Sequence, residues 1–263
     1  MALLHSFEKN GNTLFKHRGI IPLYILILAL PIMLFGNSAF YENISVEIGE
    51  GIIKPIVLGI SVLVSVAGMA IRYYAIGTTP HGTSGRNTEK QVAKQLNSKG
   101  IYSIVRHPLY LGNYLMWAGF LLFTFDILLF IIVSLVFWLY YERIMFAEER
   151  YLEKQFGDSY INWSLKVPPF IPAFKQFEKS EIPFSLRTVL RREYSGFFAM
   201  VLMYTIVDYI TAYRFDESII DNQFPFLPLR YSFIVLLISL VLMLILRTLK
   251  HHSKVLDRVE GRD

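Results

Sequence analysis

The feature that most constrains this chain is an apolar block from Tyr110 to Tyr141, in which Asp126 is the one charged residue. A single helix over this block would be about 48 Å long, at 1.5 Å per residue. That length exceeds the hydrocarbon thickness of a bilayer, which is about 30 Å. We therefore expect two tightly connected membrane helices, Leu111–Phe125 and Ile127–Tyr141, with the break at Asp126.

Further apolar stretches occur on both sides of this block. Only 18% of the residues are charged and 54% are hydrophobic, whereas roughly a quarter of the residues are charged in an ordinary soluble domain. The sequence therefore predicts an all-α fold, a polytopic bundle of about six transmembrane helices that includes the tight hairpin. The remaining predicted spans are Ile20–Phe35, Ile56–Ile71, Gly196–Tyr213 and Tyr231–Leu246.

The net charge of +5 is unevenly distributed among the connecting segments. Acidic residues dominate 38–55 and 213–230, whereas basic residues dominate 72–108 and the tail after residue 246. Because cytoplasmic loops carry an excess of Lys and Arg, this pattern places both termini, 72–108 and 142–195 in the cytoplasm. Orientation accounts for the basic excess, so we expect no nucleic-acid partner. The absence of cysteine excludes thiol nucleophiles and Cys-ligated metals, and we expect no metal site.

Two polar clusters lie at the predicted cytoplasmic ends of the hairpin helices. Arg106 and His107 precede Pro108, a residue that suits the first turn of a helix, so both lie at a helix N-terminus. Such a terminus favours an anion, although for an isolated basic pair we would expect the two side chains simply to extend to the membrane surface. Glu148 and Glu149 follow the second helix of the hairpin. Carboxylates at this position need partners unless they lie on a solvated helix face.

These clusters are parts of a longer pattern that is interrupted by the hairpin. Residues 100–112 read Gly-x-Tyr-x-x-x-Arg-His-Pro-x-Tyr-x-Gly, residues 148–160 read Glu-Glu-x-x-Leu-x-x-x-Phe-Gly-x-x-Tyr, and residues 167–172 read Val-Pro-x-x-Ile-Pro. The pattern resembles that of the isoprenylcysteine carboxyl methyltransferase-like family, and membrane phospholipid methyltransferases share much of it. Order, spacing and the intervening hairpin all fit over residues 100–172.

The resemblance implies an S-adenosylmethionine-dependent methyltransferase with three parts. N-terminal membrane helices occupy residues 1–71, the methyltransferase core occupies 72–175, and a C-terminal extension with two further spans and a basic tail occupies 176–263. A helix N-terminus suits the carboxylate of the cofactor, and an acidic pair suits its positive charges. The residues that the resemblance assigns to cofactor binding are Tyr102, His107, Pro108, Tyr110, Gly112, Glu148 and Glu149.

The resemblance also implies candidate catalytic residues near the same clusters. Glu149 and Arg106 are two of them. Eukaryotic members of the family place an arginine, proposed as catalytic, shortly before the two glutamates. A gapless alignment puts Ile144 at that place, with Arg143 one residue away, so Arg143 is the third candidate.

For the acceptor we expect the carboxylate or phosphate of a lipid or lipidated molecule. Such a group is already ionised at neutral pH, so it needs cationic and hydrogen-bonding groups instead of a general base. Arg72, Arg86 and Asn87 are the predicted acceptor-binding residues. The stretch around Arg86 resembles one in bacterial family members thought to methylate lipid A phosphate, which implies a bacterial inner membrane. Alternatively, the stretch is a capped turn before a short amphipathic helix over 88–98.

Two other functions remain open from the sequence. A phosphatidylethanolamine-type N-methyltransferase would use Glu148 or Glu149 to remove a proton from the amine. A non-enzymatic membrane protein or transporter would show ionisable residues inside its spans, and Asp208 is such a residue. Asp208 is expected either to line a polar acceptor channel or to pair with one of three arginines, Arg187, Arg191 or Arg192.

Overall fold

A computed structural model describes residues 2–36, 50–80, 91–215 and 230–259 of the chain. Within these ranges the structure is helical and contains no β-strand, which confirms the predicted all-α class. Short 3₁₀ turns occur at Ile101–Ser103 and Phe174–Gln176. The α-helices are α1 (Leu3–His17), α2 (Ile21–Phe35), α4 (Glu50–Gly77), α5 (Pro108–Leu122), α6 (Ile127–Phe156), α7 (Asp158–Ser164), α8 (Leu186–Phe215) and α10 (Tyr231–His252).

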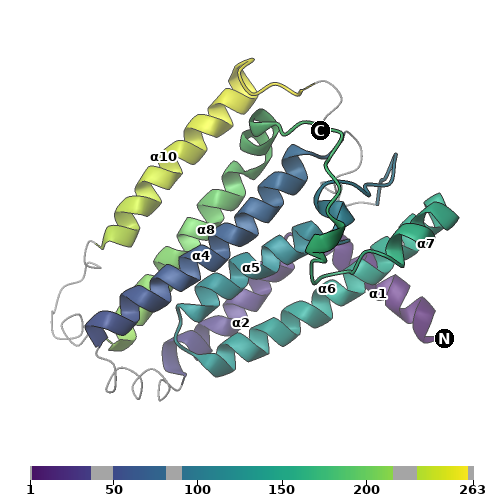
Figure 1. The fold of residues 1–263 in the computed structure, drawn as a ribbon. Helices are drawn as coiled ribbons and strands as arrows, with labels where there is room; N and C mark the ends of the chain where they lie inside the picture. Colours follow the sequence, from purple (N-terminus) through teal and green to yellow (C-terminus); the bar gives the residue numbers. More distant parts are fainter. Residues whose placement is uncertain (1, 37–49, 81–90, 216–229, 260–263) are drawn as a thin grey trace.

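The long helices lie side by side in a bundle (Figure 1). Helix α4 packs along α5 on one side and along α8 on the other, and α10 forms the outer edge against α8. Helices α2 and α6 complete the opposite side. Helix α1 turns away from the bundle and lies along the C-terminal half of α6.

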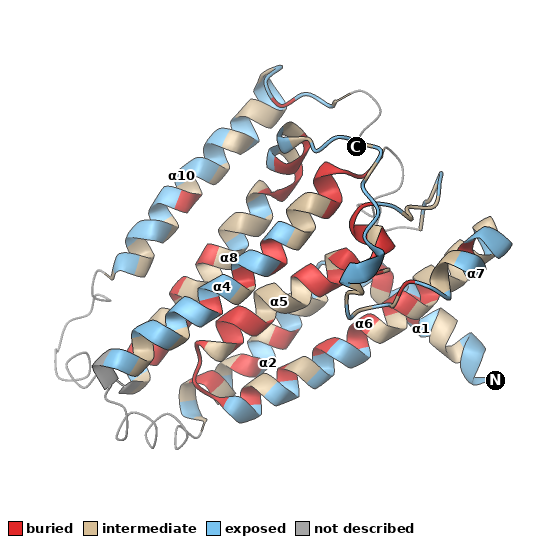
Figure 2. Cartoon of the chain, in the orientation of Figure 1, coloured by how far each residue is buried: buried red, intermediate tan, exposed pale blue. Residues whose placement is uncertain are grey.

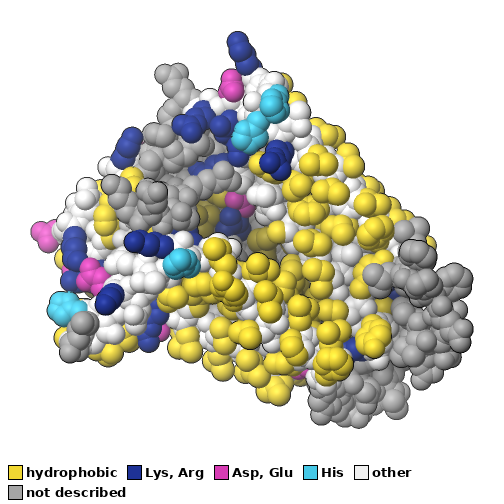
Figure 3. All heavy atoms as spheres, turned by 180° about the vertical axis from the view of Figure 1, so that it is seen from behind, with side chains coloured by type: hydrophobic (Ala, Val, Ile, Leu, Met, Phe, Trp, Pro, Cys, Tyr) yellow, Lys and Arg dark blue, Asp and Glu magenta, His cyan; other side chains and the backbone are white. Residues whose placement is uncertain are grey.

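The outer surfaces of these helices are apolar. Leu63 on α4, Leu128 on α6 and Ile238 on α10 all expose more than half of their area. In Figure 2 most of α10 is coloured as exposed or intermediate, and Figure 3 shows a broad hydrophobic face over much of the molecule. Apolar side chains turned outward over this extent are typical of helices surrounded by lipid.

Four of the described helices, α4, α6, α8 and α10, are individually long and apolar enough to cross a bilayer. Helices α1 and α2, bent by 84° at the break between them, together make a fifth candidate. The membrane bundle is therefore confirmed with four or five spans, where the sequence led us to expect about six. The difference is largely α5, whose 15 residues give a length of about 22 Å, less than the hydrocarbon thickness.

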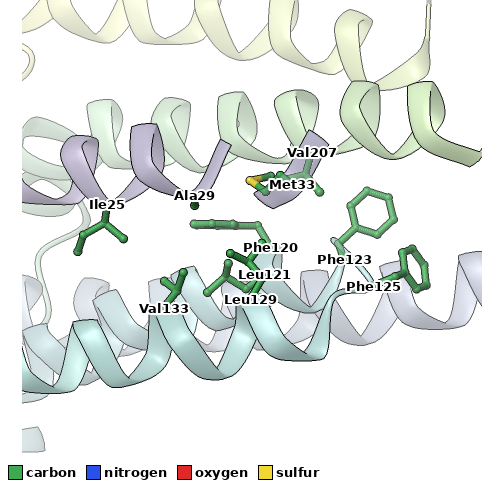
Figure 4. Packing of buried hydrophobic residues seen from close by; sticks show 10 residues of the cluster. All are labelled: Ile25, Ala29, Met33, Phe120, Leu121, Phe123, Phe125, Leu129, Val133 and Val207. Carbon is green, nitrogen blue, oxygen red and sulfur yellow. The ribbon is translucent and has the colours of Figure 1, made fainter. Parts of the chain in front are cut away.

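The predicted break at Asp126 is confirmed. Helix α5 ends at Leu122, Phe125 takes a positive φ of 58°, and Asp126 begins α6 as its N-cap. The Asp126 carboxylate accepts a hydrogen bond from the Leu129 backbone N–H at 2.8 Å, which satisfies a donor that the first turn would otherwise leave unpaired. An apolar core holds the hairpin against α2 and α8 (Figure 4). Its buried members are Ile25, Ala29, Met33, Phe120, Leu121, Phe123, Phe125, Leu129, Val133 and Val207.

Two local expectations are wrong. Residues 91–98 form no helix, although the sequence favoured one over 88–98; the first residues of that stretch lie outside the described part of the chain. Asp208 pairs with Arg230 at the start of α10, with nitrogen–oxygen distances of 2.7 and 2.9 Å. The expected arginine partners lie at the opposite end of α8, roughly 24 to 32 Å from Asp208 along the helix axis.

Candidate active site

The ends of α4, α5, α6 and α8 enclose a cavity of about 570 Å³. This volume lies in the range of pockets that bind small molecules and cofactors. The irregular segment 91–97 contributes part of the wall, as do residues where α1 meets α2. Figure 3 shows a hollow at the polar end of the molecule, beside the apolar face, with acidic and basic side chains inside it.

His107 is the centre of a hydrogen-bonded cluster on the cavity wall. Its Nε2 atom lies 2.8 Å from Oε1 of Glu149, and its Nδ1 atom lies 3.7 Å from Oε2 of Glu148. The Tyr110 hydroxyl donates to Oε1 of Glu148 at 2.7 Å. Arg106 places Nε 3.3 Å from Oε1 of Glu149. The side chain of His107 is 6% exposed, and its hydrogen bond to Glu149 restricts the orientation of the ring.

The chain folds this way locally because the proline-rich run returns to the start of α5. The backbone N–H groups of Arg106 and His107 donate to the carbonyl oxygens of Pro168 and Pro169, at 2.9 and 3.2 Å. Gly100, with φ of 61°, turns the chain into the motif, a conformation that a residue with a side chain rarely adopts. The first and third parts of the sequence pattern therefore hold each other in place.

Two tyrosines beside this cluster stay neutral at physiological pH. Burial, reinforced by the charge of Glu148, raises the pKa of Tyr102 to about 12. Burial and the charge of Glu149 likewise raise the pKa of Tyr160. Both residues line the cavity with protonated, uncharged side chains.

A second polar cluster lies on the cavity wall between α4, α5 and α8. The guanidinium of Arg72 donates to both carboxylate oxygens of Glu193, at 2.8 and 2.9 Å. Arg72 also donates to Asn113 Oδ1, and the Asn113 amide donates to the Tyr141 hydroxyl at 3.0 Å. Two parallel hydrogen bonds between an arginine and a carboxylate fix both the position and the plane of the guanidinium.

The structure brings most of the predicted site residues together on this one cavity. Two of the others, Gly112 and Arg143, are not among its lining residues. Arg86 and Asn87 lie outside the described residues. The predicted residues that line the cavity are Arg72, Tyr102, Arg106, His107, Pro108, Tyr110, Glu148 and Glu149.

Gly112 and Arg143 have other surroundings that explain their residue types. A Cβ at Gly112 would lie 2.6 Å from Cγ of Arg72 and 2.7 Å from the Gly68 carbonyl oxygen, so glycine here lets α4 and α5 pack closely. The Arg143 guanidinium lies 3.3 Å from the ring centroid of Phe7. That contact attaches α1 to α6.

Several cavity residues were missed by the sequence-based reasoning. Arg18 and the segment 91–97 contribute from the N-terminal half, and Arg192 and Glu193 contribute from α8. The only sequence signal for the α8 residues was a group of charges just before an apolar stretch, which equally suits a membrane boundary. Their meeting with Arg72 depends on how α8 packs against α4.

Comparisons with known proteins agree with this arrangement of fold and motifs. The sequence model of the family described as phospholipid methyltransferase matches residues 56–159, which include α5, α6 and the His107 cluster. These features define a polytopic membrane protein in which residues 56–159 are similar to the phospholipid methyltransferase family.

More particular similarities come from curated relatives. The protein-S-isoprenylcysteine O-methyltransferase of Schizosaccharomyces pombe is 38% identical over 77 residues, 29% of this chain and 33% of the relative. The enzyme of the same name from Saccharomyces cerevisiae is 33% identical over 111 residues, 42% of this chain and 46% of the relative. The resemblance to the isoprenylcysteine carboxyl methyltransferase-like family is thus confirmed. The chain spans less than half the length of these relatives, and no solved structure matches it.

Proposed function

We propose that this chain is an integral-membrane, S-adenosylmethionine-dependent methyltransferase that acts on an anionic oxygen of a lipid or lipidated acceptor. The observation that carries the proposal is a cavity at the polar end of the bundle. The residues that line this cavity include the motif residues at the start of α5 and in the C-terminal part of α6. The names of the curated relatives, all of them O-methyltransferases, support the same reaction class.

The donor groups of the His107 cluster suit the cofactor. We propose that His107 and the α5 N-terminus hold its carboxylate, because a helix N-terminus favours an anion. Glu148 and Glu149 balance its positive charges, and Tyr102 and Tyr110 offer aromatic surface beside them. When bound, the cofactor supplies an electrophilic methyl group on a sulfonium. The residues of this chain then bind and orient the partners and exclude water, which contributes much of the rate of such a displacement.

The charges of the cavity wall favour an anionic acceptor over an amine. The lining contains four arginines, Arg18, Arg72, Arg106 and Arg192, against three glutamates, Glu148, Glu149 and Glu193. All three glutamates already have a hydrogen-bonding partner on this chain. The four guanidinium charges exceed the three carboxylate charges by one, and a wall with a positive excess attracts an oxyanion more than an ammonium.

Within this reaction we assign Arg106 and Glu149 to the reacting end of the cavity. Arg106 is 3.3 Å from Glu149, and both lie beside His107. Arg106 would hold the negative acceptor oxygen, whose charge is lost as its bond to the methyl carbon forms and the carbon–sulfur bond breaks to leave a neutral thioether. Glu149 would hold the ring of His107. For Arg143, the third predicted catalytic residue, we propose a role in docking α1, because its guanidinium covers Phe7.

Cofactor binding by the purified protein in detergent tests the proposal. Isothermal titration calorimetry with S-adenosylmethionine should show saturable binding. His107→Ala and Glu149→Gln should each weaken it by about tenfold or more, as expected for the loss of a hydrogen bond to a charged group. Glu153→Gln is the matched control. Glu153 lies one turn along α6, pairs with Arg150 and does not line the cavity. Absence of binding by a folded wild-type protein would refute the cofactor assignment.

The amine-methylating alternative keeps some support from the description of the matching family, which names phospholipid methyltransferases. The two reactions differ in the stability of the product. A carboxyl methyl ester releases methanol in mild alkali, whereas an N-methyl group does not. Labelled product that retains its methyl group in alkali and migrates with phosphatidylethanolamine derivatives would favour the amine.

We propose further that the protein lies in a bacterial inner membrane with both termini in the cytoplasm. This orientation requires an even number of crossings, so it counts the short helix α5 as a sixth crossing beside the five candidates. The distribution of basic residues among the connecting segments supports this orientation. The cavity lies at the end of the bundle where α5 begins and α6 ends, so this orientation gives it access to a cytoplasmic cofactor.

A further inference from the structure

The segment 165–177 turns large apolar side chains outward. It follows α7, which ends at Ser164, and crosses the polar end of the bundle on its way to α8 (Figure 1). Leu165, Ile171 and Phe174 expose 80%, 79% and 75% of their areas. Packing within the chain therefore does not explain why these three residues are apolar. Apolar side chains that are this exposed and this close in the sequence indicate a contact surface.

Backbone hydrogen bonds attach this segment to the turn that precedes α5. The carbonyl oxygens of Pro168 and Pro169 accept from the turn, as described above, and the Ala173 N–H donates to the Ile104 carbonyl oxygen at 2.9 Å. These bonds lie on both sides of Phe170 and Ile171 in the sequence. The position of the segment is therefore fixed relative to the start of α5 and to the turn that contains His107.

Phe170 shows where the segment lies relative to the bilayer. Its ring centroid is 5.3 Å from that of Trp138 on α6 and 5.8 Å from that of Tyr114 on α5. Trp138 is 44% exposed and its neighbour Leu139 is also exposed, so this part of α6 belongs to the apolar outer surface. Trp138 lies one turn before Glu142, the first charged residue of α6. Tryptophan is enriched at the membrane–water interface, so the segment contacts α6 at the level of that interface.

The charges of the segment have a single sign. Lys166 and Lys175 are both exposed and lie next to two of the exposed apolar residues, and residues 165–177 include no acidic side chain. Apolar side chains beside lysines suit the boundary between headgroups and acyl chains, where the apolar groups insert and the ammonium groups attract anionic headgroups. The composition of this surface therefore matches an anionic bilayer.

We infer that the segment 165–177 is a membrane-binding loop that inserts Leu165, Ile171 and Phe174 into the surrounding bilayer and binds anionic lipids through Lys166 and Lys175. The inference does not depend on the proposed function, because none of the segment's residues, all of which the structure describes, lines the cavity. Since the loop is hydrogen-bonded to the turn before α5, its contact with the bilayer also holds that turn at the membrane surface.

Fluorescence quenching of the full-length protein in nanodiscs tests the insertion. The chain contains no cysteine, so a bimane fluorophore can be attached at Phe174→Cys alone. Phosphatidylcholine with brominated acyl chains quenches a fluorophore that touches those chains. Ser159→Cys is the matched control, because Ser159 is exposed on α7 beside Asp158. An inserted side chain lies about 5 to 10 Å into the boundary with the acyl chains, so quenching should be at least about twice as strong at Phe174→Cys.

The choice of brominated lipid tests the two lysines. Brominated phosphatidylglycerol should quench bimane at Phe174→Cys more strongly than brominated phosphatidylcholine in the same proportion. Each lysine near an anionic membrane surface raises lipid affinity by about fivefold, so Lys166→Gln with Lys175→Gln should abolish this preference. Lys94→Gln with Lys99→Gln removes the same charge from another exposed part of the chain and should leave the preference unchanged.

The insertion is refuted if brominated phosphatidylcholine quenches Phe174→Cys no more than Ser159→Cys. The apolar side chains would then face water, as a surface for a protein partner does. Equal quenching by the two brominated lipids, or a preference that survives the loss of Lys166 and Lys175, would overturn the binding of anionic lipids. Ile171→Cys provides the same measurement from a second exposed position if Phe174→Cys does not fold.

Discussion

At the scale of single residues, the most consequential interaction is the pair formed by Arg72 and Glu193. The two residues are separated by more than a hundred positions and meet only because α4 and α8 pack together. Their side chains are 19% and 9% exposed, so water replaces little of the interaction when one partner is removed.

Glu193→Gln should therefore destabilise the protein, by about 3 kcal/mol, because it leaves the Arg72 charge buried without a carboxylate. The measurement is the thermal midpoint of the detergent-purified protein, followed by tryptophan fluorescence. Glu181→Gln removes a carboxylate from a solvent-exposed pair with Lys99 and should leave the midpoint unchanged. Equal midpoints for wild type and Glu193→Gln would show that the pair contributes nothing to stability.

The sequence predicted the residues of the His107 cluster but not those of α8. His107, Tyr110 and Glu149 belong to a spaced pattern with an intervening hairpin, so their meeting follows from local chain geometry. Arg192 and Glu193 have no such pattern. Charges at the end of a membrane helix are common, and only tertiary packing shows which of them turn inward.

At the scale of helices, small residues determine how α4 and α5 approach each other. A Cβ at Gly119 would lie 2.0 Å from the Ser65 hydroxyl and 2.5 Å from the Ser61 carbonyl oxygen. A Cβ at Gly68 would lie 2.6 Å from the Gly112 carbonyl oxygen. Helices in membranes associate largely through close packing of this kind.

Gly119→Ala should consequently destabilise the bundle by about 2 kcal/mol, since the added methyl group meets backbone that cannot rotate away. Gly59→Ala is the matched control on α4, where a Cβ meets nothing within 4 Å. There alanine should be neutral or stabilising by up to about 1 kcal/mol. Thermal midpoints of both variants check the difference, and a loss of stability in Gly59→Ala but not in Gly119→Ala would contradict this packing.

The position of a helix could be predicted from the sequence where a single residue determines its end. It could not be predicted where tertiary packing determines whether the helix forms. Asp126 interrupts an otherwise apolar block and caps the helix that follows, so the hairpin could be located from the sequence. The segment 91–98 has polar and apolar residues at helical spacing, yet it forms no helix and contributes to the cavity wall. Helix propensity in so short a segment is a weak preference that tertiary contacts override.

At the scale of the whole molecule, the proposed orientation can be tested because the chain contains no cysteine. Single cysteines can be introduced at Ser45, Lys179 and Ser253. In intact bacterial cells an impermeant maleimide should label Ser45→Cys, which lies in an acidic connection, and should label the other two only after permeabilisation. Labelling of Lys179→Cys and Ser253→Cys in intact cells, with Ser45→Cys protected, would reverse the orientation.

The membrane bundle was predictable from apolar runs and loop charges, whereas the number of spans was not. Helix α5 contains as apolar a stretch as its neighbours, but its 15 residues begin only at Pro108, after the returning proline-rich run has fixed the preceding turn. The same turn brings His107 to the cavity. The late start of α5, at Pro108, therefore leaves His107 in the turn that faces the cavity.

Methyl transfer by the purified protein tests the central claim most directly. The protein would be reconstituted in phosphatidylcholine nanodiscs and given S-adenosylmethionine with a tritiated methyl group. The acceptors, in separate reactions, are N-acetyl-S-farnesylcysteine, phosphatidic acid and phosphatidylethanolamine. We predict tritium in the farnesylcysteine or phosphatidic acid product, and little in either with His107→Ala. Label in phosphatidylethanolamine alone, or in none of the three although the cofactor binds, would contradict the account.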